Sequence, residues 1–92
     1  PMLSFKSFDE VIERANDHDL GLCSYVCTNS MEKAHLASEQ LETGSVAVNT
    51  GAVAIAEAPF GGIKQSGYGR EGGSMAIKDY LNVKYTHMGI KG

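Results

Sequence analysis

The chain has 92 residues, enough for one small domain or for part of a larger protein. Apolar residues make up 42% of the sequence and charged residues 21%, a balance that excludes an intrinsically disordered chain. The net charge is −3 and the basic residues are scattered, so we do not expect a nucleic-acid partner or an acidic membrane surface as a partner.

The beginning of the chain and its cysteine usage predict the cellular setting. Pro1 is not an initiator methionine, so we expect a segment cut from a longer chain. The longest purely apolar run, residues 52–56, is far too short to span a bilayer. Cys23 and Cys27 are too few for a disulfide scaffold and favour a reducing compartment. We therefore expect a protein of the cytoplasm or of an organelle matrix, with no membrane partner.

A strand and a helix are predicted first. Residues 2–6 read as a short strand. Residues 7–10 then form a capping box, in which the Ser7 hydroxyl accepts from the N–H of Glu10 while the Glu10 carboxylate reaches back. Apolar residues recur at the spacings i, i+3, i+4 and i+7 from the second residue of this box. This spacing predicts a helix that ends at the polar turn 16–19.

Two further strands and a second helix are predicted next. Residues 22–28 place apolar groups on both faces, which suits a strand in a covered sheet. A helix is predicted over 30–42, with Gly44 in a left-handed conformation after its end, and a strand over 45–49. This order predicts the α/β class, with a partial parallel sheet and flanking helices. Asn49 lies at the carboxyl end of the last strand, where such sheets bind ligands.

The second half of the chain contains a long connection. Residues 50–73 include seven glycines, and a loop of this length is usually functional when it is ordered. Its aromatic and apolar side chains favour an ordered loop. A helix is then predicted from near residue 72 to residue 81, and residues 83–88 alternate like a half-buried strand.

Residues 67–72 match the pattern GxGxxG, which holds a pyrophosphate at a helix N-terminus in dinucleotide-binding folds. That role needs an apolar strand before the first glycine, whereas residues 64–66 are polar. It also needs an acidic residue about twenty positions later, and the chain ends at Gly92. We therefore expect a tight backbone turn here and no cofactor-binding residue in the chain.

The remaining candidates for catalysis or metal binding are isolated. Cys23 and Cys27 have no base or further ligand within sequence reach, and buried structural cysteines are expected. His18, His35 and His87 are too widely spaced for a metal site. We therefore predict neither a catalytic residue nor a metal ligand in the chain.

Residues 59–71 read PFGGIKQSGYGRE and form the most informative segment. Pro59 stiffens its entry, Phe60 supplies a large apolar face, and Gly61 and Gly62 permit close approach of another backbone. The residue types alone predict either a binding loop or a structural corner.

This segment resembles the PFGG-x-K-x-SG-x-GRE signature near the C-terminus of aldehyde dehydrogenases. The resemblance covers essentially the whole chain and includes residues 10–16, 43–49 and 79–85. Within the family, residues 48–51 and 58–62 are most similar to succinate-semialdehyde dehydrogenases.

The resemblance implies that residues 1–81 are the C-terminal part of a catalytic α/β domain and that residues 82–92 are an oligomerisation strand and tail. It implies oxidation of an ω-carboxy aldehyde, such as succinate semialdehyde, by NAD or NADP in a homo-oligomer, either a dimer or a tetramer. The cysteine nucleophile, the glutamate base and the cofactor site of such enzymes have no counterpart in these 92 residues. The chain would supply substrate-tunnel wall and subunit contacts and would be inactive alone.

Individual site residues also follow from the resemblance. Phe60 matches an aromatic residue of the substrate tunnel, and Ala54 and Ile55 match the loop at the substrate's distal end. Ala54 replaces a serine that helps hold the substrate carboxylate in succinate-semialdehyde enzymes, and a methyl group cannot donate that hydrogen bond. The signature positions implied to be mainly structural are Asn49, Pro59, Gly61, Gly62, Lys64, Ser66, Gly67, Gly69, Arg70 and Glu71.

A non-catalytic α/β structural or interaction module is the alternative interpretation, because the chain pairs no nucleophile with a base. The choice between NAD and NADP, the identity of the aldehyde and the size of the oligomer are left open by the sequence.

Overall fold

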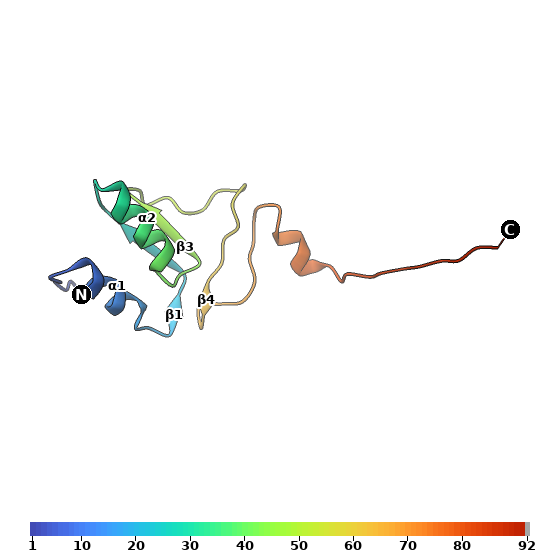
Figure 1. Ribbon diagram of the computed structural model, residues 1–92, viewed down its shortest axis with the longest axis horizontal. Helices are drawn as coiled ribbons and strands as arrows, with labels where there is room; N and C mark the ends of the chain where they lie inside the picture. Colours follow the sequence, from blue (N-terminus) through green and yellow to red (C-terminus); the bar gives the residue numbers. More distant parts are fainter. Residues whose placement is uncertain (92) are drawn as a thin grey trace.

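Helices and short strands alternate along the computed structural model, which describes residues 1–91 (Figure 1). In chain order the elements are α1 (Phe8–Asn16), β1 (Leu20–Gly21), β2 (Cys23–Val26), α2 (Met31–Gln40), β3 (Ser45–Val48), β4 (Ile63–Lys64) and the 3-10 helix η1 (Ala76–Tyr80). The predicted α/β class is confirmed, with two small sheets. In this described part of the chain, no helix has the length and apolar character needed to cross a membrane.

Helix α1 begins at the predicted cap. The hydroxyl of Ser7 accepts a hydrogen bond from the N–H of Glu10 at 3.1 Å. The Glu10 carboxylate accepts from the N–H of Lys6 at 2.8 Å, one residue earlier than in the standard capping box. Ile12 is the buried residue of this helix. Local capping chemistry therefore explains where the helix starts.

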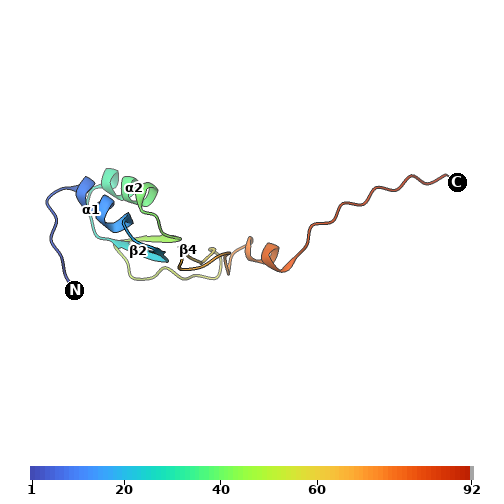
Figure 2. The same ribbon diagram turned by 90° about the horizontal axis from the view of Figure 1, so that it is seen from below.

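The parallel pair β2–β3 carries α1 and α2 on the same side (Figure 2). Helix α2 connects the two strands and begins at Ser30, whose hydroxyl accepts from the N–H of Lys33 at 3.2 Å. Ala37 of α2 and Ala47 of β3 are both buried. Their small side chains allow the helix and the sheet to approach closely, and the predicted strand–helix–strand unit is confirmed.

Strand β4 returns the long connection to the first half of the chain. It pairs antiparallel with β1, with Leu20 opposite Lys64 and Gly21 opposite Ile63. The N–H of Gly21 also donates to the hydroxyl of Ser66 at 2.8 Å. These bonds anchor the middle of the glycine-rich connection beside the start of β2.

The parallel sheet is smaller than predicted. Residues 2–6 form no strand, and β1 pairs antiparallel, so the parallel sheet in the described residues has the two strands β2 and β3. A strand is stable only when a neighbour pairs with its N–H and C=O groups, and residues 1–7 are exposed. The prediction of a further parallel strand at the start of the chain is wrong.

Gly44 lacks the left-handed backbone that was predicted for it. A Cβ atom at this position would overlap the carbonyl oxygen of Gly61. The glycine is therefore required for direct packing of two backbone segments, and not for a helix terminus.

The predicted helix over 72–81 is reduced to the short helix η1. Gly72 and Gly73 have φ angles of 72° and 65°, and such left-handed values interrupt a right-handed helix. Residues 81–91 then extend away from the rest of the molecule without forming a strand (Figure 1). The alternating segment 83–88 has no neighbouring strand among residues 1–91, and its stacking against partner subunits stays a prediction.

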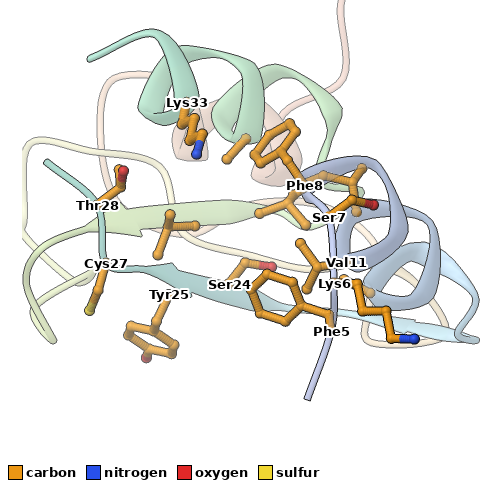
Figure 3. Close-up of a pocket in the computed structure, with 15 residues that line it drawn as sticks. Phe5, Lys6, Ser7, Phe8, Val11, Ser24, Tyr25, Cys27, Thr28 and Lys33 are labelled. Atoms are coloured by element: carbon orange, nitrogen blue, oxygen red, sulfur yellow. The ribbon is translucent and has the colours of Figure 1, made fainter. Parts of the chain in front are cut away.

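The two cysteines differ in environment. Both are free thiols, with Cys23 half-buried in β2 and Cys27 exposed. The side chain of Cys27 points to the side of the strand away from α2, as the exposed Tyr25 does (Figure 3). The predicted burial of Cys27 is wrong.

Candidate functional site

The three residues predicted to contact substrate meet at one surface hollow, which we call the Phe60 hollow. Phe60 and Glu71 form an isolated antiparallel bridge, in which the N–H of each donates to the carbonyl of the other at 2.7 and 2.8 Å. The N–H of Ala58 donates to the carbonyl of Ile55 at 3.2 Å and turns the chain before the bridge. The residues that line the hollow are Ala54, Ile55, Ala56, Ala58, Phe60, Glu71 and Gly72.

The Phe60 hollow offers mainly apolar contacts. The ring of Phe60 is half-buried, while Ala54 and Ile55 are exposed, the latter to 61%. Aliphatic and aromatic side chains of this kind suit the hydrocarbon part of a small ligand. Glu71 is the one ionisable residue in the lining. A negatively charged end of a ligand would therefore need a cationic partner from outside this hollow.

Asn49 joins the carboxyl ends of β2 and β3, where the long connection leaves the sheet. Its φ angle of 58° lies in the left-handed region, which asparagine tolerates better than most residues. Its side-chain Oδ1 accepts from the N–H of Thr28, and its Nδ2 donates to the carbonyl of Thr28, both at 2.9 Å. This pair of bonds sets the direction in which the chain departs toward the Phe60 hollow.

Lys64 ties β4 to the end of α1. Its Nζ donates to the carbonyls of Asn16 at 3.0 Å and His18 at 3.1 Å, and to the Glu42 carboxylate at 2.9 Å. An ammonium group has three donors, and all three are used here. The positive charge also lies at the C-terminal end of α1, where the helix dipole favours a cation. Lys64 therefore has no remaining donor for a ligand.

Arg70 and Asp79 hold the turn at Gly69. The guanidinium Nη1 of Arg70 donates to the carbonyls of Gly62 at 3.0 Å and Gly69 at 2.8 Å. The main-chain N–H of Arg70 donates to the carboxylate Oδ2 of Asp79 at 3.0 Å. The sequence interpretation included Arg70 and both glycines but missed Asp79, because an acidic residue in a predicted helix reads as a solvated surface charge.

The GxGxxG segment folds as the predicted backbone turn and does not fit a dinucleotide. Gly69 has a φ angle of 85°, and a Cβ atom there would lie 2.8 Å from the Asp79 carboxylate. The space beside the glycine is thus occupied by a negative group, which repels a pyrophosphate. The N–H of Arg70 is already donated to that carboxylate, and the next helix begins only at Ala76. We assign no cofactor step to this segment.

A second, apolar groove lies between the helices and the β2–β3 sheet (Figure 3). Phe8 and Val11 of α1 line this groove, with Phe8 toward α2 and Phe5 beside Ser24 of β2 (Figure 3). Among its hydroxyl groups, Ser7 caps α1 and Thr28 accepts from the N–H of Ser30 at 3.1 Å. These two hydroxyls therefore serve local structure, and the groove is a loosely filled part of the apolar layer.

Within residues 1–91, no group of three or more histidine, cysteine or acidic residues is arranged to hold a metal ion. The histidines and cysteines are also absent from the lining of the Phe60 hollow. The lining of the hollow therefore contains neither a thiol nucleophile nor an imidazole base. Its residues can contact a ligand without supplying either group.

Comparison with known proteins defines the class. A model of the aldehyde dehydrogenase family matches residues 1–86, and the chain belongs to this family. The family resemblance predicted from the PFGG segment is therefore confirmed.

Individual relatives show which members of the family the chain resembles. It is 49% identical over 89 residues to a 3-sulfolactaldehyde dehydrogenase of Pseudomonas putida, an alignment that covers 97% of this chain and 18% of the relative. It is 43% identical over 90 residues to the succinate-semialdehyde dehydrogenase (NADP+) of Escherichia coli, covering 98% of this chain and 19% of that enzyme. An aldehyde dehydrogenase of Bacillus cereus, solved in complex with NAD+, is similar with a TM-score of 0.91 and 45% identity over 97% of this chain and 18% of that one. The chain thus spans less than one fifth of the length of these relatives.

Proposed function

We propose that the chain is the C-terminal part of an NAD(P)-dependent aldehyde dehydrogenase that oxidises an ω-carboxy aldehyde, such as succinate semialdehyde, to the acid. Residues 1–81 would complete the catalytic α/β domain, and residues 82–92 would form an oligomerisation strand and tail. The nucleophile, the base and the cofactor site are assigned to the remainder of the enzyme. One observation carries the proposal: Ala54, Ile55 and Phe60 gather at a single apolar hollow in a chain that matches the family over residues 1–86.

We assign a supporting role to the signature residues around the hollow. The side chains of Asn49, Lys64, Ser66 and Arg70 each bind main-chain groups of distant segments. Such bonds hold a long loop in one conformation, and a fixed loop keeps a reacting group in productive geometry. We therefore propose that these residues shape the hollow without contacting the substrate.

The substrate class follows from the lining and from the relatives. The names 3-sulfolactaldehyde and succinate semialdehyde both describe an aldehyde with a negatively charged group at its other end. The apolar lining of the Phe60 hollow suits the hydrocarbon part between these ends. The charged end would lie beside Ala54 and would need a cationic partner from outside the hollow.

The substrate proposal is tested in a chimera, called here the E. coli chimera, in which residues 1–92 replace the matching segment of the E. coli succinate-semialdehyde dehydrogenase. We expect this chimera to oxidise succinate semialdehyde. The variant Ala54→Ser should raise kcat/KM for succinate semialdehyde by at least about tenfold relative to a neutral aldehyde of equal length, because a hydrogen bond to a charged group is worth about 1.5–3 kcal/mol. Steady-state kinetics with both aldehydes measure the ratio.

The matched control for this variant is Ala52→Ser, which places the same hydroxyl on the same loop outside the lining of the hollow. It should leave the ratio unchanged. An unchanged ratio for Ala54→Ser would remove Ala54 from the specificity argument, and a chimera with no activity toward succinate semialdehyde would contradict the proposed substrate.

We also propose that the tail joins copies of the enzyme in a dimer or a tetramer. The side chains of Val83, Tyr85, Met88 and Ile90 are exposed on an extended chain. Unpaired N–H and C=O groups along such a segment accept a neighbouring strand.

The two free cysteines support a reducing setting, and we propose the cytoplasm or an organelle matrix as the location.

A further inference from the structure

We infer that Asp79 is a positioning residue, which holds Phe60 in place through the main chain of the Arg70 turn. This inference rests on the proposed function, because it assigns Phe60 to the wall of the substrate site. The Asp79 carboxylate lies outside the signature segment 59–71. It belongs to η1, which follows that segment in the chain.

The first link joins Asp79 to Arg70. The Asp79 carboxylate accepts the main-chain N–H of Arg70 at 3.0 Å, and it also fills the space beside the left-handed Gly69. A hydrogen bond between a backbone N–H and an ionised carboxylate is stronger than one between neutral groups. The carboxylate therefore fixes the main chain at the point where it turns toward Glu71.

The second link joins that turn to Phe60. Glu71 follows Arg70 directly, and its N–H and C=O are both paired with the main chain of Phe60 at 2.8 and 2.7 Å. The Arg70 guanidinium holds the other side of the same turn by donating to the carbonyl of Gly62 at 3.0 Å. A displacement of Arg70 is thus transmitted to Phe60 through adjacent peptide groups. Asp79 does not line the Phe60 hollow, but it lines a second hollow together with Phe60 and Arg70.

A double-mutant cycle in the E. coli chimera separates this role from a general effect on folding. Asp79→Ala should lower kcat/KM for succinate semialdehyde at least fivefold when Phe60 is present. In the Phe60→Ala background the same change should lower it less than twofold, because the group that Asp79 positions has been removed. Asp79→Asn keeps an oxygen acceptor and should stay within twofold of the parent chimera.

Hydrogen exchange gives a readout that does not depend on activity. In Asp79→Ala, but not in Asp79→Asn, the amides of a peptide that covers residues 56–73 should exchange faster, as measured by mass spectrometry. Equal losses of kcat/KM in both backgrounds, or an unchanged exchange rate in Asp79→Ala, would overturn the inference. If the parent chimera does not oxidise aldehydes, the proposed function fails, and the exchange rates alone decide whether Asp79 holds the turn.

Discussion

Replacing Phe60 with alanine in the E. coli chimera is expected to lower kcat/KM for succinate semialdehyde by roughly tenfold or more, which corresponds to about 1.4 kcal/mol of transition-state stabilisation. The melting temperature should change little. The ring is only half-buried, and the bridge to Glu71 uses main-chain atoms that the substitution leaves in place. Loss of the ring therefore removes a wall of the substrate site, and a loosely held aldehyde reaches its reactive geometry less often.

The matched control for this prediction is Phe60→Leu, which keeps a large apolar side chain at the same position. Its loss of kcat/KM should be clearly smaller than that of the alanine variant. Steady-state kinetics and thermal unfolding are measured on the same preparations. A fall in melting temperature that accounts for the loss of activity in both variants would identify Phe60 as a core residue, with no part in the substrate site.

The second large effect is expected for Gly44→Ala. A Cβ atom at this position overlaps the carbonyl oxygen of Gly61, so the two backbone segments must separate before the methyl group fits. Overpacking of this kind typically costs about 1–3 kcal/mol, and the clash with a backbone atom places this site at about 3 kcal/mol. The segment that follows Phe60 would shift with Gly61, so we expect a lower melting temperature and a loss of aldehyde oxidation together.

Gly51→Ala is the control for the glycine prediction. Gly51 is exposed, and a Cβ atom there meets no other atom within 4 Å. This variant should keep both the melting temperature and the activity of the parent chimera. A Gly44→Ala protein as stable and as active as Gly51→Ala would show that the contact with Gly61 does not exist in the folded enzyme.

Local sequence signals predicted the first half of the fold well. Ser7 caps its helix as predicted, and Ser30 caps the second helix, because an N-cap needs only a hydroxyl within three residues of a free N–H. The two strands β2 and β3 pair in parallel around α2, as their apolar content and order indicated. These elements depend on interactions between residues that are close in sequence or joined by a single helix.

The predictions that failed depend on partners far along the chain. Residues 2–6 have a strand-like pattern, but they lack a neighbouring strand among the described residues and remain unpaired. The sequence predicts that Gly44 ends a helix in a left-handed conformation. The contact that requires a glycine there comes instead from Gly61, in a distant loop. Neither the absence of a pairing strand nor a backbone contact across a loop leaves a local signal.

In the candidate site, too, a continuous sequence segment was informative and the contacts between segments were not predicted. The PFGG segment pointed to Phe60 and to its neighbours in the signature through the family resemblance. The three acceptors of Lys64 were not predicted, because they lie 22 to 48 residues away in sequence and become its neighbours only after β4 pairs with β1. Asp79 lies nine residues after Arg70, and its carboxylate reaches the turn only when η1 returns to it. The resemblance thus pointed to residues of the Phe60 hollow but not to the contacts that hold them in place.

The central claim is that these 92 residues shape a substrate wall while bond making takes place on other parts of the enzyme. The most direct measurement follows NAD(P)H formation from succinate semialdehyde by the isolated chain and, in parallel, by the E. coli chimera at equal molar concentration. We predict no aldehyde-dependent NAD(P)H from the isolated chain and steady turnover by the chimera. Sustained turnover by the isolated chain would contradict the claim.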